Sequence, residues 1–354
     1  MFFRSKRTTP THSVETLEKY VVDVWHALLG RRPDENALAH LVRALEEGRN
    51  PIEFFFETYD SSEAITRRQE LSPYLQSDVR VFVPPGHYYS PIVDPVALRS
   101  SSFEERRKSD SLDGISIDFD VMEKTFNILM DETSDLDFPR SRNVSFRYYS
   151  ENDMYASGDA IILAGMIRLA KPRKIIEVGS GFSSAVMLDT LDRSVGIDAS
   201  LTFIEPYPER LDDLLWDEDR DRIRVIRSGV QEVSPSIFLD LDRDDILFLD
   251  TTHVSKTGSD VNFELFDVLP KLKPGVLVHF HDVFEGFEYP DDWVYEQNRS
   301  WNEIYLLRSF LMYNHEFEIV YFNHAFYCRK MHLIEERCPR MIGWPGGGLW
   351  LRRK

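Results

Sequence analysis

The chain has 354 residues, 42% of them hydrophobic and 13% aromatic, which is enough for one large domain with a buried core and a smaller second domain. Its formal net charge of −18, from 60 acidic against 42 basic residues, argues against a nucleic-acid binder and against binding to an anionic membrane surface, because both need a basic face. No segment approaches the about 18 apolar residues of a membrane span, residues 1–12 lack the apolar run of a signal peptide, and the two cysteines form no disulfide framework. We therefore expect a cytoplasmic protein.

Residues 1–70 are expected to form a small all-α domain. Apolar residues recur at helical spacing over Leu17–Leu29, Gly30 follows as a stop signal, a second helix opens at Asp34, and a third begins near Pro51. The stretch VWHALLGRRPD, together with a later Ser-Ser-Glu, resembles a bacterial helical domain of unassigned function that is often attached to glycan-related or surface-associated proteins. This resemblance implies no catalytic chemistry.

Residues 71–144 are rich in proline, serine and charge, and we predict that they connect the two domains. Within them, the segment Val83–Pro91 places three consecutive ring side chains after two prolines and a glycine, which fix a turn. This segment either packs on the main domain or covers a substrate as a lid. A helix over residues 120–130 is expected to dock the connector onto the domain that follows.

From Asp159 onward, helices alternate with short apolar strands, which predicts a parallel sheet with helices on both faces. The segment Gly346–Arg352 is expected to add a last edge strand. The expected helices span residues 159–169, 183–191, 208–215, 260–270 and 301–312, and the expected strands span residues 174–178, 201–205, 222–226, 245–249, 275–280 and 317–322.

The most informative segment is KIIEVGSGFSS, which begins at Lys174. A strand ends there in an acid, Glu177, and continues into a turn through Gly179 and Gly181, which lets a ligand approach the backbone closely. A pyrophosphate would be repelled by that acid, whereas a ligand with a cationic amino acid portion suits it. The segment resembles motif I of the class I S-adenosylmethionine-dependent methyltransferases. That resemblance implies a Rossmann-like α/β fold over residues 145–354, with a seven-stranded, mostly parallel sheet whose last strand is antiparallel.

Four strand ends supply the expected cofactor contacts, because ligands of open α/β sheets bind beyond the C-terminal ends of the strands. The turn at Gly179, Ser180 and Gly181 can hold the carboxylate of S-adenosylmethionine, and Glu177 can accept hydrogen bonds from its ammonium group. Glu205, at the end of the second strand, can bind both ribose hydroxyls. By resemblance, the loop with Gly229 and Val230 frames the adenine, and Asp250 belongs to the same cofactor site.

The ends of the fourth and fifth strands carry the candidate catalytic residues Asp250, His253, His281 and Asp282. In one reading, His253 or His281 acts as a general base on a hydroxyl group without a metal. In another, Asp250, His281 and Asp282 hold a divalent metal, Mg²⁺ or Mn²⁺. His281 stands where related sugar methyltransferases often have an acid, which favours a softer metal. A structural role for the histidines is the third reading.

Residues near these strand ends also need an interpretation. His279 alternates away from His281 along its strand and is expected to be buried and paired. Trp293, Tyr295 and Trp301 follow the fifth strand and can either stack on a sugar or aromatic substrate or pack the insertion that carries them.

The resemblance implies an S-adenosylmethionine-dependent methyltransferase of the kind encoded among bacterial glycan and natural-product genes. The expected reaction is O-methylation of a saccharide or a glycosylated small molecule. The alternative is a catalytically silent module that binds the cofactor and recruits a partner. A dehydrogenase is disfavoured by Glu177 and by Ser184, which stands where a third glycine is usual. A homo-oligomer is left open by the exposed apolar positions of the helical domain.

Overall fold

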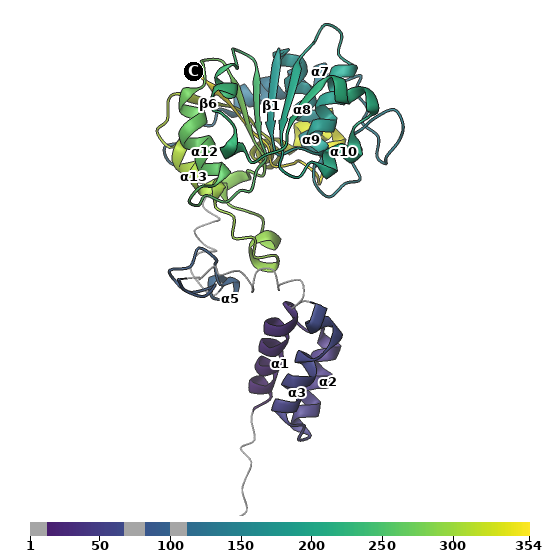
Figure 1. Ribbon diagram of the computed structural model, residues 1–354, viewed down its shortest axis with the longest axis vertical. Coiled ribbons are helices and arrows are strands. Elements are labelled where there is room, and N and C mark those ends of the chain that lie inside the picture. Colours follow the sequence, from purple (N-terminus) through teal and green to yellow (C-terminus); the bar gives the residue numbers. More distant parts are fainter. Residues whose placement is uncertain (1–12, 67–81, 100–111) are drawn as a thin grey trace, which may run out of the picture. The chain divides into compact units, whose positions relative to one another are not determined.

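The computed structural model describes residues 13–66, 82–99 and 112–354 (Figure 1). The chain divides into two compact units, Met1–Phe82 and Val83–Lys354, which we call the helical unit and the sheet unit. The expected connector is therefore not a separate body, because its described residues from Val83 onward belong to the sheet unit. Among the described residues, no helix combines the length and apolar character that a membrane crossing requires.

The helical unit consists of α1 (Val14–Leu29), α2 (Glu35–Glu46) and α3 (Pro51–Tyr59), close to the expected positions. The ends of these helices follow ordinary capping chemistry. The side chains of Ser13, Asp34 and Asn50 accept N-terminal amide hydrogen bonds, and Gly30 ends α1 with a φ of 69°, in the left-handed region that glycine tolerates. The helices bury a small apolar core made of Leu17, Val21, Val24, Val42, Leu45 and Phe54.

The sheet unit is built on a seven-stranded sheet in the order β3-β2-β1-β4-β5-β7-β6. Its strands are β1 (Lys174–Val178), β2 (Ser200–Ile204), β3 (Ile223–Ile226), β4 (Ile246–Leu249), β5 (Leu277–Phe280), β6 (Phe317–Phe322) and β7 (Leu349–Arg353). The pairs from β3 to β5 are parallel, and β7 is antiparallel to both of its neighbours. This confirms the expected Rossmann-like methyltransferase sheet.

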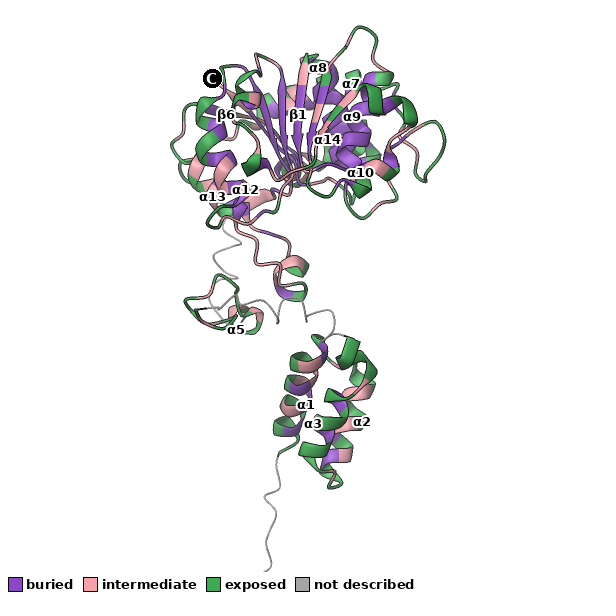
Figure 2. Cartoon of the chain, viewed as in Figure 1, coloured by how far each residue is buried: buried purple, intermediate pink, exposed green. Residues whose placement is uncertain are grey.

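Helices cover both faces of the sheet (Figure 1). On one side lie α8 (Ser157–Ala170), α9 (Phe182–Asp192) and α10 (Glu209–Leu214), and on the other lie α12 (Asp260–Phe263) and α13 (Glu303–Leu311). The strands between them are largely buried (Figure 2). The remaining helices are α5 (Pro95–Arg99), α7 (Phe119–Glu132), α11 (Ser236–Leu239) and α14 (Asn323–Arg337), with short turns η1 (Asp217–Asp221), η2 (Val230–Glu232), η3 (Glu264–Val268), η4 (Leu269–Lys271), η5 (Glu285–Phe287), η6 (Asp292–Glu296) and η7 (Pro339–Met341).

The structure corrects three sequence expectations. The C-terminal strand β7 is not an edge strand, because it lies between β5 and β6, and β6 forms the edge. The helix α14 was not expected at all, since few of its residues are buried. The expected helix 260–270 is α12 followed by the π-helical turn η3 and the 3-10 turn η4.

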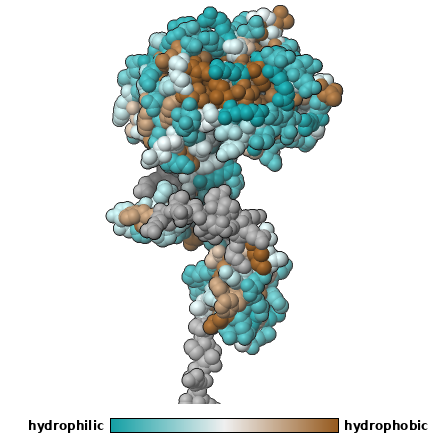
Figure 3. Space-filling model, in the orientation of Figure 1, coloured by the Kyte–Doolittle hydropathy of each residue, from teal (hydrophilic) through white to brown (hydrophobic). Residues whose placement is uncertain are grey.

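The expected docking helix is α7, which packs against α8, β6 and α14 and places Met122, Phe126 and Leu129 in the main core. Outside the core, hydrophilic residues cover most of the face of the sheet unit shown in Figure 3, with a hydrophobic area in its upper part. The site described next depends on the loops at the C-terminal ends of β1, β2, β4 and β5.

Candidate functional site

The glycine-rich turn after β1 is fixed by its contact with the end of β4. Gly179 has a φ of 82°, and a Cβ atom at this position would lie 1.7 Å from the backbone oxygen of Asp250. Only glycine fits there, both for its backbone conformation and for the space available. The same turn leaves the Ser180 hydroxyl buried without a hydrogen-bond partner among the described residues. The turn is therefore shaped for close backbone approach and offers an unused polar atom.

Glu177 lies beneath this turn and is fully buried. Its two carboxylate oxygens accept hydrogen bonds from the hydroxyls of Ser183 and Ser184 in the first turn of α9. Burial raises the pKa of Glu177 to about 8, while the two hydroxyls act in the opposite direction. In this structure Glu177 therefore braces the start of α9, at the place where the sequence predicts a contact with the ammonium group of the cofactor.

Glu205 is brought directly to the turn, as the strand order requires. Its carboxylate accepts a hydrogen bond from the Ser180 amide at 3.0 Å and one from the Tyr207 amide at 2.8 Å. A carboxylate has about four lone-pair sites, so acceptor capacity remains for a ligand's hydroxyl groups. In the next loop, Val230 is almost fully buried at the start of η2 and is preceded by Gly229.

The catalytic candidates converge on His253, which is buried in the loop after β4. Its Nε2 atom lies 3.4 Å from Asp250 Oδ1 and 3.5 Å from Asp282 Oδ2, and its Nδ1 atom lies 2.8 Å from Glu303 Oε2. The indole ring of Trp301 lies over the imidazole, with 4.4 Å between ring centroids. His253 is thus held from one side by Glu303 and faces two strand-end carboxylates with the other.

The backbone at this site is held in unusual conformations. His253 has a φ of 58° and Asp282 has a φ of 57°, both in the left-handed region. Such conformations cost of order 1–3 kcal/mol and persist only where the surroundings impose them. The carbonyl of His253 accepts hydrogen bonds from the amides of Asn302 and Glu303, at 3.0 and 3.1 Å, which fixes the imidazole in place.

Charge in this cluster is unevenly balanced. Burial alone would lower the pKa of His253, but its contacts with Asp250 and Glu303 and the charge of Asp282 raise it well above the usual value. Burial favours the neutral form of Asp250, yet the nearby imidazoles of His281 and His253 hold its pKa below the usual value. Burial raises the pKa of Asp282. Three carboxylates thus face two imidazoles at close range, while Arg210 and Arg299 act on Asp250 and Asp282 without forming an ion pair with them. The close contacts therefore favour the binding of a further cation.

The donor set for a metal differs from the one the sequence suggested. Ligand atoms of Asp250, His253 and Asp282 all lie within 4.8 Å of one another, and His281 lies outside this group. His281 instead stacks on Tyr155, with 5.1 Å between ring centroids, and its Nε2 atom lies 3.6 Å from Asp282 Oδ1. Two carboxylates and one imidazole suit a divalent ion such as Mg²⁺ or Mn²⁺.

His279 is buried as expected, but neither of its ring nitrogens has a hydrogen-bond partner among the described residues, so the expected pairing was wrong. It stacks on Phe248, with 4.0 Å between ring centroids, and burial lowers its pKa well below the usual value. A neutral imidazole therefore packs inside the sheet, away from the carboxylate cluster.

Sequence reasoning missed Glu303 and the contact of Trp301 with His253. Glu303 begins α13, far along the chain from β4, and a glutamate in the first turn of a helix is common for electrostatic reasons alone. No motif or strand-end rule marks it. The aromatic insertion was noted, but nothing in the sequence shows which of its rings reaches the histidine.

Comparisons with known proteins agree with this geometry. Residues 176–283 match the family model described as a methyltransferase domain. An uncharacterized protein of Archaeoglobus fulgidus is 30% identical over 135 residues, which is 37% of this chain, and the chain spans 61% of the length of that relative.

Several solved structures are also similar to this chain. SAH-bound methyltransferase PaMTH1 of Podospora anserina is 13% identical, with a TM-score of 0.38 and coverage of 78% of this chain and 100% of that one. The O-methyltransferase TomG of Streptomyces achromogenes, in complex with SAM, is 14% identical, with a TM-score of 0.36 and coverage of 68% and 92%. A methyltransferase of Geobacter sulfurreducens is 16% identical, with a TM-score of 0.33 and coverage of 75% and 99%. At these scores no property of these proteins is transferred to the chain.

Proposed function

We propose that the protein is an S-adenosylmethionine-dependent O-methyltransferase. The observation that carries the proposal is the position of the Glu303–His253 pair, which meets the carboxylates of Asp250 and Asp282 at strand ends next to the glycine-rich turn. A methyl acceptor and a cationic methyl donor would meet at this edge of the sheet, because ligands of open α/β sheets bind there.

The residues present fit the cofactor. The unpartnered Ser180 hydroxyl in the glycine-rich turn suits the amino acid portion, and Glu205 lies within reach of the same turn for the ribose hydroxyls. When bound, S-adenosylmethionine supplies a methyl group on a sulfonium centre. The excess of carboxylates around His253 favours that positive charge electrostatically.

The chemistry expected of the protein's own residues is alignment and proton removal. The acceptor hydroxyl would lie against Nε2 of His253, which would take its proton when the hydroxyl oxygen receives the methyl group. Glu303 holds Nδ1–H and stabilises the imidazolium that forms. A cation near Asp250 and Asp282 would lower the pKa of His253, because its positive charge would offset the carboxylates that raise that pKa. Close placement of the two reactants supplies much of the rate.

In an alternative, metal-dependent reading, Asp250, Asp282 and Nε2 of His253 would hold a divalent metal, and His253 would then be a ligand and not the base. The metal would lower the pKa of a bound acceptor hydroxyl. The sequence expectation used His281 for this site, and the geometry favours His253 in its place. If instead His253 or His281 acts as the base without a metal, methyl transfer should not depend on Mg²⁺ or Mn²⁺.

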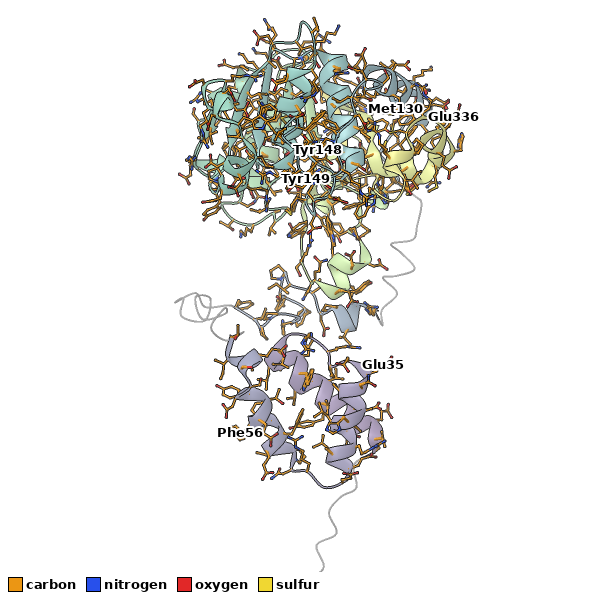
Figure 4. The ribbon with its side chains drawn as sticks, turned by 90° about the vertical axis from the view of Figure 1, so that its right-hand side faces the viewer. Glu35, Phe56, Met130, Tyr148, Tyr149 and Glu336 are labelled. Carbon is orange, nitrogen blue, oxygen red and sulfur yellow. The ribbon has the colours of Figure 1, made fainter. Side chains whose placement is uncertain are left out.

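For the acceptor we propose a saccharide or glycosylated small molecule. The support is a cleft of about 880 Å³ that combines exposed aromatic surface with charged and amide side chains, a lining that suits stacking and hydroxyl recognition. Trp344 in its wall is 67% exposed, and Tyr148 also lines it, on the segment that precedes α8 (Figure 4). Ala156 in the cleft wall follows Tyr155, whose ring stacks on His281.

The deciding experiment is calorimetric titration of the full chain with S-adenosylmethionine, with and without Mg²⁺ or Mn²⁺, followed by a methyl-transfer assay on glycosides. Binding together with transfer supports the enzyme, and a metal-dependent heat supports the metal site. Binding without transfer to any hydroxyl acceptor would favour the silent module that recruits a partner. Absence of binding under both conditions would overturn the proposal, and the fold would stand.

A further inference from the structure

A second cavity, of about 190 Å³, lies inside the sheet unit between two segments that are distant in sequence. One wall comes from the residues just before and within α5, and the other comes from the insertion that follows β5. Its lining is mainly apolar and aromatic and consists of Pro91, Val93, Leu98, Tyr289, Trp293, Val294, Arg299, Ser300, Trp301, Asn302 and Tyr305.

This cavity shares a wall with the proposed catalytic histidine. Trp301 lines the cavity and also packs on the imidazole of His253. The next residue, Asn302, lines the cavity too, and its amide donates to the carbonyl of His253. A group seated in the cavity would therefore lie one indole ring away from His253.

The walls on the insertion side are held in place by their own contacts. Trp293 and Trp301 pack edge to face, with 5.3 Å between ring centroids, and the Arg299 guanidinium lies 3.9 Å from the centre of Trp293 and 4.5 Å from that of Trp301. The amide of Ile304 donates to the hydroxyl of Tyr289 at 3.3 Å. The rings thus pack the insertion and, at the same time, leave a pre-formed hollow beside it.

The opposite wall is tied to the insertion by polar contacts outside the cavity. Arg99, at the end of α5, pairs with Glu296 at 2.5 Å and lies over the ring of Tyr295 at 4.4 Å. The side-chain amide of Asn298 donates to the carbonyl of Val93 at 3.4 Å. These contacts bring Leu98 to the cavity, while Val96 on the same helix does not line it and is 63% exposed.

The size and lining of the cavity define the chemistry that it can take. Apolar cavities of about 150 Å³ in proteins bind benzene, so a volume of about 190 Å³ accommodates one six-membered ring. Aromatic walls favour a flat ring, which they contact edge to face or by offset stacking. We propose that this cavity binds an aromatic ring of the methyl acceptor and that the segment from Pro91 to Leu98 closes it. This inference rests on the proposed function, because it treats the ring as part of the acceptor.

The segment Val83–Pro91 was expected either to pack on the main domain or to cover a substrate as a lid. Its rings Tyr88 and Tyr89 are 79% and 63% exposed, so they do not form the wall. The wall is formed by the residues that follow them.

The test compares two probes on the full chain, phenyl β-glucoside and methyl β-glucoside, by saturation-transfer NMR titration in the presence of S-adenosylmethionine. The phenyl compound should bind about tenfold more tightly, because its ring is removed from water. Leu98→Trp fills the cavity and should remove that advantage. Val96→Trp adds the same side chain to the exposed face of α5 and should keep it.

The cofactor provides the separate readout. Calorimetry should give the same affinity for S-adenosylmethionine in the wild type, Leu98→Trp and Val96→Trp, which also shows that the variants are folded. Equal binding of the two glucosides to the wild type, or an unchanged phenyl preference in Leu98→Trp, would overturn the ring-binding proposal while cofactor binding stands. If the phenyl preference depends on Leu98 but the protein does not bind S-adenosylmethionine, the ring site is supported and the proposed function is wrong.

Discussion

Two buried ionic clusters in the sheet unit differ in how completely they are neutralised. Around Arg147, whose side chain is 1% exposed, the guanidinium donates to Asp189 at 3.0 Å, to Asp192 at 2.8 Å and to Asp219 at 2.5 Å, and it lies over the ring of Trp216. Arg222 also pairs with Asp192 at 2.7 Å and lies 3.8 Å from Asp219, and Arg193 lies 3.8 Å from Asp189, so three guanidinium groups face the three carboxylates. Around His253, by contrast, Nε2 stands 3.4 and 3.5 Å from two carboxylates, beyond ordinary hydrogen-bond lengths.

Further differences point the same way. In the Arg147 cluster, Asp189 also accepts the backbone amides of Arg147 and Tyr148, so its acceptor capacity is used by the fold. Near His253, Glu264 is buried in the π-helical turn η3, and its carboxyl oxygens have no hydrogen-bond partner among the described residues. Burial raises the pKa of Glu264 well above the usual value. π-Helical turns frequently accompany functional sites.

The comparison separates structural from functional charge. A cluster whose donors and acceptors are all used within the protein stabilises the fold and leaves no group to bind a ligand. A cluster with surplus carboxylates and long contacts is under-satisfied, and a cation supplied from outside relieves it. Damage to the Arg147 cluster should therefore change stability without changing chemistry, and damage to the His253 cluster should change chemistry with little loss of stability.

The largest expected effect is on turnover in His253→Asn. Asparagine tolerates the left-handed backbone at this position, but it cannot act as a base. We expect methyl transfer to fall by about 10²–10⁴-fold, because general-base catalysis contributes that range, with cofactor affinity retained. The measurement is kcat by quantification of the demethylated cofactor. His26→Asn, at an exposed position of α1, is the control and should leave kcat unchanged. Turnover of His253→Asn within a few-fold of the wild type would exclude His253 as the base.

The second effect is on stability in Arg147→Met. Removal of the guanidinium leaves Asp189 and Asp219 buried without their closest cationic partner, so the free energy of unfolding should fall by about 3–5 kcal/mol, as measured by urea denaturation. Arg140 pairs with Glu151 at 2.8 Å but is 85% exposed, so Arg140→Met should cost less than about 1 kcal/mol. Equal losses in the two variants would contradict the distinction between a closed buried cluster and a surface pair.

Much of this frame could be predicted from the sequence. The strand that contains Glu177 and the turn at Gly179 lie where the sequence predicted them, because a short apolar strand followed by a glycine-rich turn has few alternative structures. Glu205 meets that turn because strand order in this fold is regular. The strand ends also placed Asp250 and Asp282 together. Such predictions rest on the local pattern of apolar residues, which corresponds to the buried strands of the structure.

The rest depends on tertiary contacts that local patterns do not encode. His253, and not His281, belongs to the group with Asp250 and Asp282. The backbone of His253 has a positive φ, which the sequence around it does not signal. Glu303 reaches the site from a different element. For β7 a signal existed: Leu349, Trp350 and Leu351 are consecutive and all buried, a run typical of an interior strand, which its glycine-rich approach and terminal position obscured.

A third effect is on the pH dependence of stability. Because burial raises the pKa of Glu177 to about 8 from the usual 4.5, the folded chain keeps a proton that the unfolded chain loses over that window. Unfolding free energy should therefore be highest below about pH 4.5 for this group and fall toward pH 8, by up to about 1.4 kcal/mol per pH unit. Urea denaturation between pH 5 and pH 8 should give a shallower decline for Glu177→Gln. Glu209→Gln, at an exposed position of α10, should keep the wild-type slope. Parallel slopes in all three proteins would mean that Glu177 is ionised in the fold.

The smallest expected effect on stability comes from Asp282→Asn, which removes one surplus carboxylate and keeps a residue that tolerates the φ of 57°. Because like charges are relieved, the free energy of unfolding should stay the same or rise by up to about 1 kcal/mol, although the substituted side chain is largely buried. The heat of Mn²⁺ binding should disappear if Asp282 holds a metal with Asp250 and His253. Asp267→Asn, with a side chain 57% exposed, should alter neither quantity. A marked loss of stability in Asp282→Asn would place the His253 cluster in the same structural class as that of Arg147, and the surplus charge would then no longer indicate a ligand.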